Sequence, residues 1–306
     1  MPGAGPMMRR DFPKLYAERL PYIREMIGPD EWPEVDNMWE QFFSVENSDR
    51  MREEMLQYAG FGYFREMGEN DAVTYDALVQ GPSKVINHVL YGLGYQIGYL
   101  AAKHDLDGII NKNAPELGRS LRMSVQTLAA SFWNGSFDTQ TTPDGQYYFS
   151  TAHTFVRGGG TWSNRSSTDA TLGHTALETA LVNFMKQKDL MGNPMPLSAK
   201  SLMIPPDLEP IAYELTQSRM RHDTTTHAES YVYNKVRPIV WPFLTITTMW
   251  VVLGPKEHRK VKWYWNIRPE TSHGFDFDRE AAKTKTLFAC SFGAWDGRGT
   301  YGSRGY

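Results

Sequence analysis

The stretch LDGIINKNAPELGRSLRMSVQTLAASFWN, residues 106–134, decides the fold. Its apolar side chains recur every three or four residues, at Leu106, Ile110, Ala114, Leu117, Leu121, Val125, Leu128 and Phe132. That spacing predicts one face of an α-helix, about 40 Å long at 1.5 Å per residue. Pro115 should kink this helix or open its second part, because proline is tolerated only in a first turn. We therefore expect a long spine helix over about residues 104–134.

The chain before this helix divides into two parts. Residues 1–59 combine aromatic side chains with prolines that interrupt every apolar pattern, at positions 13, 21, 29 and 33. Such a segment packs poorly on itself, so we expect an arm that packs on something else, such as a neighbouring subunit. Residues 60–84 are polar on both faces and surround the turn residues 68–71, which predicts a projecting β-hairpin. Alternation over residues 85–97 predicts one more strand.

After the spine helix, the pattern changes from mixed to mostly β. Helices are expected where apolar residues have helical spacing, and strands where β-branched and aromatic residues gather. The expected helices are an amphipathic one through residues 177–185, ending near the stop signal at 192–194, and a second over 207–218. The expected strands lie within residues 200–206, 236–244, 245–254, 261–268 and 286–292.

Composition and charge exclude several classes of protein. With 41% hydrophobic and 22% charged residues, the chain is neither disordered nor membrane-spanning. It shows no apolar signal segment at its start, and the single cysteine, Cys290, indicates a reducing compartment. Residues 1–150 carry 13 Lys and Arg against 21 Asp and Glu, a balance of −8, whereas residues 255–306 carry 10 against 6, a balance of +4. Complementary ends suit head-to-tail contacts between copies, although ordinary surface variation is an equal alternative.

Few residues suggest chemistry. The glycines at 158–160 do not match a phosphate-binding fingerprint, so we expect a connection that needs positive φ angles. The best metal candidates are His222 and His227 with Asp223 and Glu229, but their spacing does not place both imidazoles on one helix face. His104, Asp105 and Asp107 could supply hard metal ligands, but their simpler role is to open the spine helix, where acidic residues favour the positive end of the helix dipole. We predict no catalytic, cofactor-binding or metal site.

The remaining candidates are expected to be structural. His153 and His174 have no nearby partners in sequence, and a hydrogen-bonded structural role is expected for both. Cys290, on an alternating strand, is expected to be a small core residue. Trp263 and Trp265, around Tyr264, could stack on sugars or bases, but in a strand they more often pack on cross-strand partners.

Three stretches in order carry a resemblance to a known family. They are FSTAH followed by GGGTWSN, ALETALVNFMKQKDLMGNPMPLSAKSLMIPPDLEPIAYEL, and the ending FGAWDGRGTYGSRGY. Together they resemble the major capsid proteins of tailed bacteriophages, with the Hong Kong 97-type fold, and are most similar to the Mu-like major head subunit group. The resemblance covers about residues 150–306, whereas residues 1–147 match in layout alone.

The resemblance implies an α+β capsid fold in five parts. These are an N-terminal arm (1–59), a projecting hairpin called the E-loop (60–84), a peripheral domain with the spine helix (85–170), an axial domain (171–270) and C-terminal strands returning to the peripheral domain (271–306).

It also implies a non-enzymatic function. Copies would form hexamers and pentamers of an icosahedral shell around double-stranded DNA, in a virion assembled in the host cytoplasm. Expected partners are the chain itself, a separate scaffold protein, a maturation protease, a portal and DNA contacted non-specifically, without a cofactor or a membrane. An encapsulin-type compartment shell and a soluble α/β hydrolase using His153 or the His222/His227 pair are the alternatives.

Overall fold

The structure, a computed structural model, describes residues 18, 21, 34–104, 109–221 and 229–306. Its elements in chain order are η3 (Glu34–Gln41), β1 (Ser44–Asn47), β2 (Arg52–Ala59), β3 (Val79–Asn87), β4 (Val89–Gly98), α2 (Tyr99–Lys103), α3 (Ile109–Asn134), β5 (His153–Thr154), β6 (Thr161–Trp162), α4 (His174–Met185), β7 (Ser201–Ile204), η4 (Pro206–Leu208), α5 (Glu209–Gln217), β8 (Arg237–Val240), β9 (Trp250–Leu253), β10 (Val261–Asp276), β11 (Ala281–Ala294) and β12 (Thr300–Ser303).

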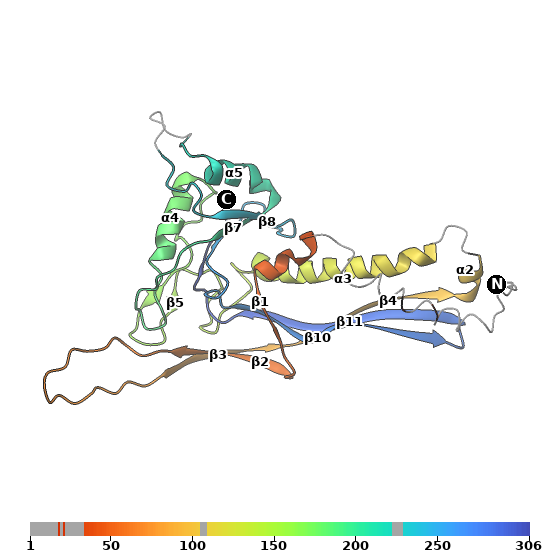
Figure 1. The fold of residues 1–306 in the computed structure, drawn as a ribbon, viewed down its shortest axis with the longest axis horizontal. Helices are drawn as coiled ribbons and strands as arrows, with labels where there is room; N and C mark the ends of the chain where they lie inside the picture. Colours follow the sequence, from red (N-terminus) through yellow and green to blue (C-terminus); the bar gives the residue numbers. More distant parts are fainter. Residues whose placement is uncertain (1–17, 19–20, 22–33, 105–108, 222–228) are drawn as a thin grey trace.

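The molecule is elongated, with two lobes and a projection (Figure 1). One lobe is a long limb in which α3 runs beside strands β4, β10 and β11. The other lobe holds α4 and α5 around β7 and β8. Residues 60–78 leave the ends of β2 and β3 and extend away from both lobes. The architecture is therefore α+β, as the sequence predicts.

The long sheet has the strand order β1-β10-β11-β4. Strand β1 pairs in parallel with β10, and the other two pairings are antiparallel. Trp263 lies opposite Phe292 with their rings stacked, and Trp265 lies opposite Cys290. Since cross-strand neighbours on one face pack together, this face forms an aromatic layer. The prediction that the tryptophans pack on cross-strand partners is confirmed.

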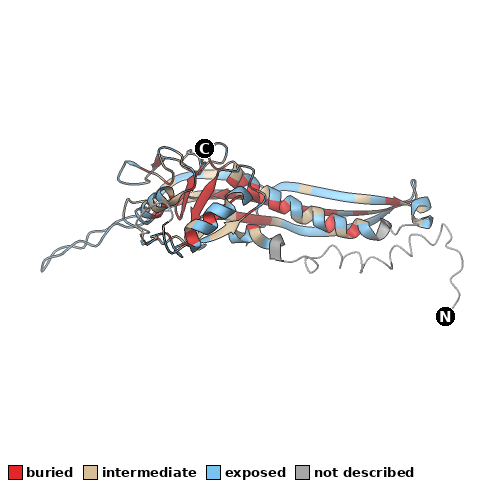
Figure 2. Cartoon of the chain, turned by 90° about the horizontal axis from the view of Figure 1, so that it is seen from above, coloured by how far each residue is buried: buried red, intermediate tan, exposed pale blue. Residues whose placement is uncertain are grey.

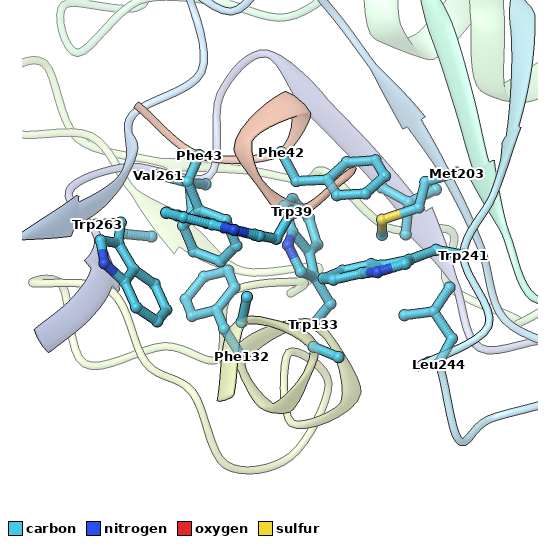
Figure 3. Packing of buried hydrophobic residues seen from close by; sticks show 14 of the residues in the cluster. Trp39, Phe42, Phe43, Phe132, Trp133, Met203, Trp241, Leu244, Val261 and Trp263 are labelled. Atoms are coloured by element: carbon cyan, nitrogen blue, oxygen red, sulfur yellow. The ribbon is translucent and has the colours of Figure 1, made fainter. Parts of the chain in front are cut away.

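The main core joins this layer to α3 and to the segment before β1 (Figure 3). Trp39, Phe42 and Phe43 are buried among aromatic side chains of α3 and β10. The ring of Phe43 lies 5.8 Å from that of Phe132 and 5.9 Å from that of Trp263. The expectation that the apolar residues before position 59 pack outside their own subunit is therefore wrong for this segment. Its rings fill this subunit's own core, which costs less than leaving them in water.

A second sheet, in the order β12-β9-β7-β8, forms the other lobe. It pairs β7 in parallel with β8 and antiparallel with β9. Leu177, Leu181 and Phe184 of α4 pack in a cluster with buried residues of this sheet. The helices and strands expected over residues 177–218 are thus found, although α4 ends at Met185, before the glycine–proline stop signal.

Several expectations about limits need correction. Helix α3 is described over Ile109–Asn134 with Pro115 inside it, so proline does not open its second part. His104 ends α2 instead of opening α3, while Asp105 and Asp107 lie outside the described residues. The hairpin strands are 52–59 and 79–87, so the hairpin extends beyond the expected limits of 60 and 84 at both ends. Strand β10 crosses the expected boundary at 270, and β12 joins the sheet of β7–β9, not the long sheet.

Candidate assembly surfaces

The projecting loop, residues 60–78, exposes an unusual number of large apolar side chains. Phe64 is fully exposed, at 106%, and Tyr75 is 93% exposed. Figure 2 shows the projection exposed along its length. The exposed set is Phe61, Tyr63, Phe64, Met67, Val73, Tyr75 and Leu78. Clusters of exposed apolar side chains on soluble proteins mark interaction sites, so this loop is the first candidate assembly surface.

Polar bonds give the loop a defined course. At its tip, the Gly68 amide donates to Asp71 Oδ2 at 2.7 Å, and Asn70 has a φ of 74°. Nearer the base, Asp76 Oδ2 accepts the Gly62 amide at 3.0 Å, which ties the outgoing and returning chains together. This hydrogen bond from Gly62, with a further one from Arg157, lowers the pKa of Asp76 to about 2. The carboxylate is therefore ionised at neutral pH.

A second candidate surface lies where β3 continues into β4. Strand β4 is the last strand in the order of the long sheet, and Leu90 and Leu93 on it are about 60% exposed (60% and 57%). Val85 and Val89 are also exposed. A long edge strand with exposed apolar side chains is a place where another chain can pack.

Two buried polar side chains, His153 and Asn164, anchor a cluster of hydrogen bonds that is called the polar clamp. His153 Nδ1 lies 2.8 Å from Asp144 Oδ2, Nε2 lies 3.2 Å from the Tyr148 carbonyl oxygen, and the imidazole stacks on Trp162. Asn164 donates to the carbonyl oxygens of Tyr148 and Gly297, at 2.8 and 3.1 Å. The predicted structural role of His153 is confirmed, since its ring nitrogens are engaged in holding backbone and carboxylate.

The clamp also contacts the glycine-rich end of the chain. Arg298 donates to both oxygens of Asp296, at 2.9 and 2.7 Å, and lies 4.2 Å over the Trp162 ring. A Cβ on Gly302 would lie 2.8 Å from the ring of Phe149. Gly302 is therefore part of the core, where the absence of a Cβ permits close approach of the chain to the ring.

The three glycines at 158–160 connect β5 to β6. All three have positive φ angles, of 92°, 70° and 91°. Backbone in this region is costly for residues with a Cβ, so the predicted connection is confirmed. Arg157, directly before the glycines, reaches the projecting loop and donates to Asp76 Oδ1 at 2.5 Å.

Three further sequence candidates lie within the described residues. Cys290 is buried on β11, as predicted. His174 Nε2 lies 3.1 Å from the Ser230 hydroxyl, which confirms its hydrogen-bonded role. Glu229 is exposed and lies 3.8 Å from Arg219.

The proposed partners of Glu229 in a metal site, residues 222, 223 and 227, lie outside the described residues. Within the described part of the chain, no group of three His, Cys, Asp or Glu side chains could hold a metal ion. Nor does any described helix have the length and apolarity needed to cross a bilayer.

The family follows from a comparison with known sequences. A family model described as phage capsid protein matches residues 84–303, well over half of the chain. The chain belongs to the phage capsid protein family. It functions as a major capsid subunit and is located in the virion shell. No curated protein sequence matches it.

Solved capsids share the fold of this subunit at low sequence identity. The capsid protein of cyanophage P-SCSP1u is 11% identical, with a TM-score of 0.57 over 87% of this chain and 86% of that one. That of bacteriophage JBD30, decorated with minor capsid protein trimers, is 14% identical, with a TM-score of 0.55 over 71% and 94%. The fold is therefore the Hong Kong 97-type capsid fold, as the resemblance implied.

The same fold also occurs outside phage heads. The virus-like particle from Pyrococcus furiosus is 7% identical to this subunit, with a TM-score of 0.55 over 94% of this chain and 99% of that one. Fold alone does not separate a head subunit from such a particle, whereas the family match favours the phage head over an encapsulin-type shell. The Mu-like subgroup is not identified by these comparisons and stays a prediction.

Proposed function

We propose that this capsid subunit forms hexamers and pentamers that close an icosahedral shell around double-stranded DNA. The observation that supports this most is the projecting loop, whose exposed side chains have no place in their own subunit. Burying one such side chain is worth about 1.5–3 kcal/mol, so seven of them provide a large driving force for association. The proposal assigns the chain no enzymatic activity.

The loop then lies across a neighbouring subunit. Residues 60–78 carry one Arg against four Asp and Glu, a balance of −3, whereas residues 255–306 have a balance of +4. Opposite potentials orient the encounter of two copies. A contact between two different surfaces is head-to-tail, and it forms closed rings where the rotation between copies closes. Hexamers and pentamers are such rings.

The partners expected from the resemblance belong to this proposal. They are a separate scaffold protein, a maturation protease and a portal, with assembly in the host cytoplasm and DNA held non-specifically. The net charge of −3 suits a shell that encloses DNA without gripping it. The division into peripheral and axial domains at residue 170 is also part of the proposal.

Expression of the chain, with and without a candidate scaffold, tests the proposal. Size-exclusion chromatography and negative-stain microscopy should show capsomers, tubes or closed shells. A species that stays monomeric at all concentrations and salts, with and without scaffold, would refute it.

The arm is tested separately by truncation. Because Trp39, Phe42 and Phe43 belong to the core, the deletion must stop at residue 33 and not include the whole expected arm of residues 1–59. A chain starting at residue 34 should fold with nearly unchanged thermal stability but assemble poorly. Normal shells from this truncation would contradict the assembly role of the arm.

A further inference from the structure

One carboxylate joins the projecting loop to the body of the subunit. Asp76 accepts the Gly62 amide on the outgoing chain and the Ala77 amide on the returning chain, at 3.0 and 2.9 Å. Its Oδ1 also accepts Arg157 Nη1 at 2.5 Å. The outgoing and returning segments at the base of the loop therefore meet at Asp76. Arg157, which lies outside the loop, binds this residue.

Arg157 is itself fixed to the lobe that contains α4. The amides of Val156 and Arg157 donate to the Leu190 carbonyl oxygen, at 3.2 and 3.4 Å. A Cβ on Gly81 of β3 would lie 2.7 Å from the Val156 side chain, so the hairpin passes directly against this segment. Val156 and Arg157 therefore connect the hairpin to Leu190.

We propose that Arg157 is a positioning residue, which aims the projecting loop by holding Asp76 before a neighbouring subunit is met. The side chains of Arg157 and Asp76 are 43% and 30% exposed, so the contact is a surface ion pair. Such pairs shift a conformational ratio by about two- to five-fold, not by orders of magnitude. Arg157 therefore biases the direction of the loop but lets it yield on docking.

The three glycines after Arg157 fit this role. Their positive φ angles turn the chain directly after the arginine and bring residue 160 back toward Phe155, whose amide donates to the Gly160 carbonyl oxygen at 3.4 Å. The arginine thus stands at the start of a tight turn that glycine makes possible. The glycine turn has no other role in the proposed assembly. Here it holds Arg157 in the position from which this residue directs the loop.

The inference rests on the proposed assembly for its purpose, but its first test does not. Spin labels at Glu69→Cys on the loop tip and Lys186→Cys on the body report the direction of the loop as a distance distribution. The native Cys290 is buried and does not take the label. The background pair is compared with Arg157→Gln, which removes the charge, and Arg157→Lys, which keeps it. Arg65→Gln removes a charge from the same loop without touching Asp76 and is the matched control.

Arg157→Gln should broaden the distribution, with the ratio of the original population to the remaining population reduced about two- to five-fold. Arg157→Lys and Arg65→Gln should match the background. Sodium chloride at 1 M, where the Debye length is about 3 Å, should broaden the background and leave Arg157→Gln unchanged. An Arg157→Gln distribution that superimposes on the background would overturn the inference, as would equal broadening by Arg65→Gln.

Assembly gives the second readout. Arg157→Gln should keep the melting temperature of the parent and lower the yield of regular shells at equal protein concentration. If the parent itself does not assemble, the proposed function fails while the distances still decide the role of Arg157. If Arg157→Gln assembles as well as the parent at every concentration, the positioning role is refuted.

Discussion

Replacing Phe43 by alanine separates the core of this subunit from its assembly surface. Phe43 precedes β1 in a proline-rich part of the sequence, yet it is fully buried. Its ring lies within 6.4 Å of four others: Trp39, Phe132, Trp133 and Trp263. Removing it leaves a cavity between α3 and β10 that these large rings cannot easily fill.

The expected loss follows from this packing. Truncation of a buried phenylalanine to alanine costs about 3–5 kcal/mol, from lost transfer energy and the cavity left behind. At about 2 °C per kcal/mol for a chain of this length, the melting temperature should fall by about 6–10 °C. Differential scanning calorimetry and urea unfolding of the unassembled subunit measure this loss.

Phe64→Ala is the matched control, because it removes the same side chain from a fully exposed position. It should change stability by less than about 0.5 kcal/mol and reduce assembly. If Phe43→Ala were as stable as the parent, the placement of residues 39–43 in the core would be wrong. If Phe64→Ala unfolded the subunit, the loop would not be free of the core.

Three more substitutions or measurements follow from buried contacts. Gly302→Val should destabilise the subunit by about 1–3 kcal/mol, because a Cβ would lie 2.8 Å from the Phe149 ring, and calorimetry would detect this. Burial alone would raise the pKa of Asp144, but hydrogen bonds, the largest from His153, lower it to about 2. Since this lies below the unfolded value of about 3.9, its stabilisation should be complete above about pH 4 and be lost as the pH falls toward 2. Unfolding free energy should thus fall more steeply over this range in the parent than in Asp144→Asn, and equal slopes would contradict the assignment. Burial raises the pKa of the Cys290 thiol to about 12, so a thiol reagent at pH 8 should modify it only after denaturation.

The sequence was most informative where one periodicity dominates. The stripe from Leu106 to Phe132 predicts α3 because three- and four-residue steps leave no other regular structure. Proline within the stripe does not end the helix, since one lost hydrogen bond is offset by the packing of the whole face. Alternation likewise predicts β11, but not that its partners are β10 and β4, because alternation defines a face and not a neighbour.

Prediction fails where the partner is remote in sequence. The local sequence around Trp39 and Phe43 indicates only that apolar residues follow a series of prolines. The ring that packs on both is Trp263, more than two hundred residues later in the chain. Nothing local distinguishes packing within the subunit from packing on a neighbour. The predicted arm therefore includes residues 39–43, which belong to the subunit's own core.

The limits of the hairpin strands differ from the prediction for a different reason. Strand β2 buries the polar residues Glu53 and Gln57 on its inner face. Glu53 accepts the Ser48 hydroxyl, and Gln57 donates to the Trp295 carbonyl oxygen at 2.6 Å. These hydrogen bonds satisfy the polar groups of both side chains, so the side chains can be buried. Polar residues at these inward positions interrupt the apolar alternation by which a strand is recognised. The sequence predicts the turn at residues 68–71 but not the limits of the strands that lead to it.

Electron cryomicroscopy of the assembled particle tests the central claim most directly. The account predicts an icosahedral shell of hexamers and pentamers in which residues 60–78 of each subunit lie against a neighbour, with Phe64 and Tyr75 covered. A shell in which this loop projects into solvent, or a protein that forms no shell with or without its scaffold, would contradict the account.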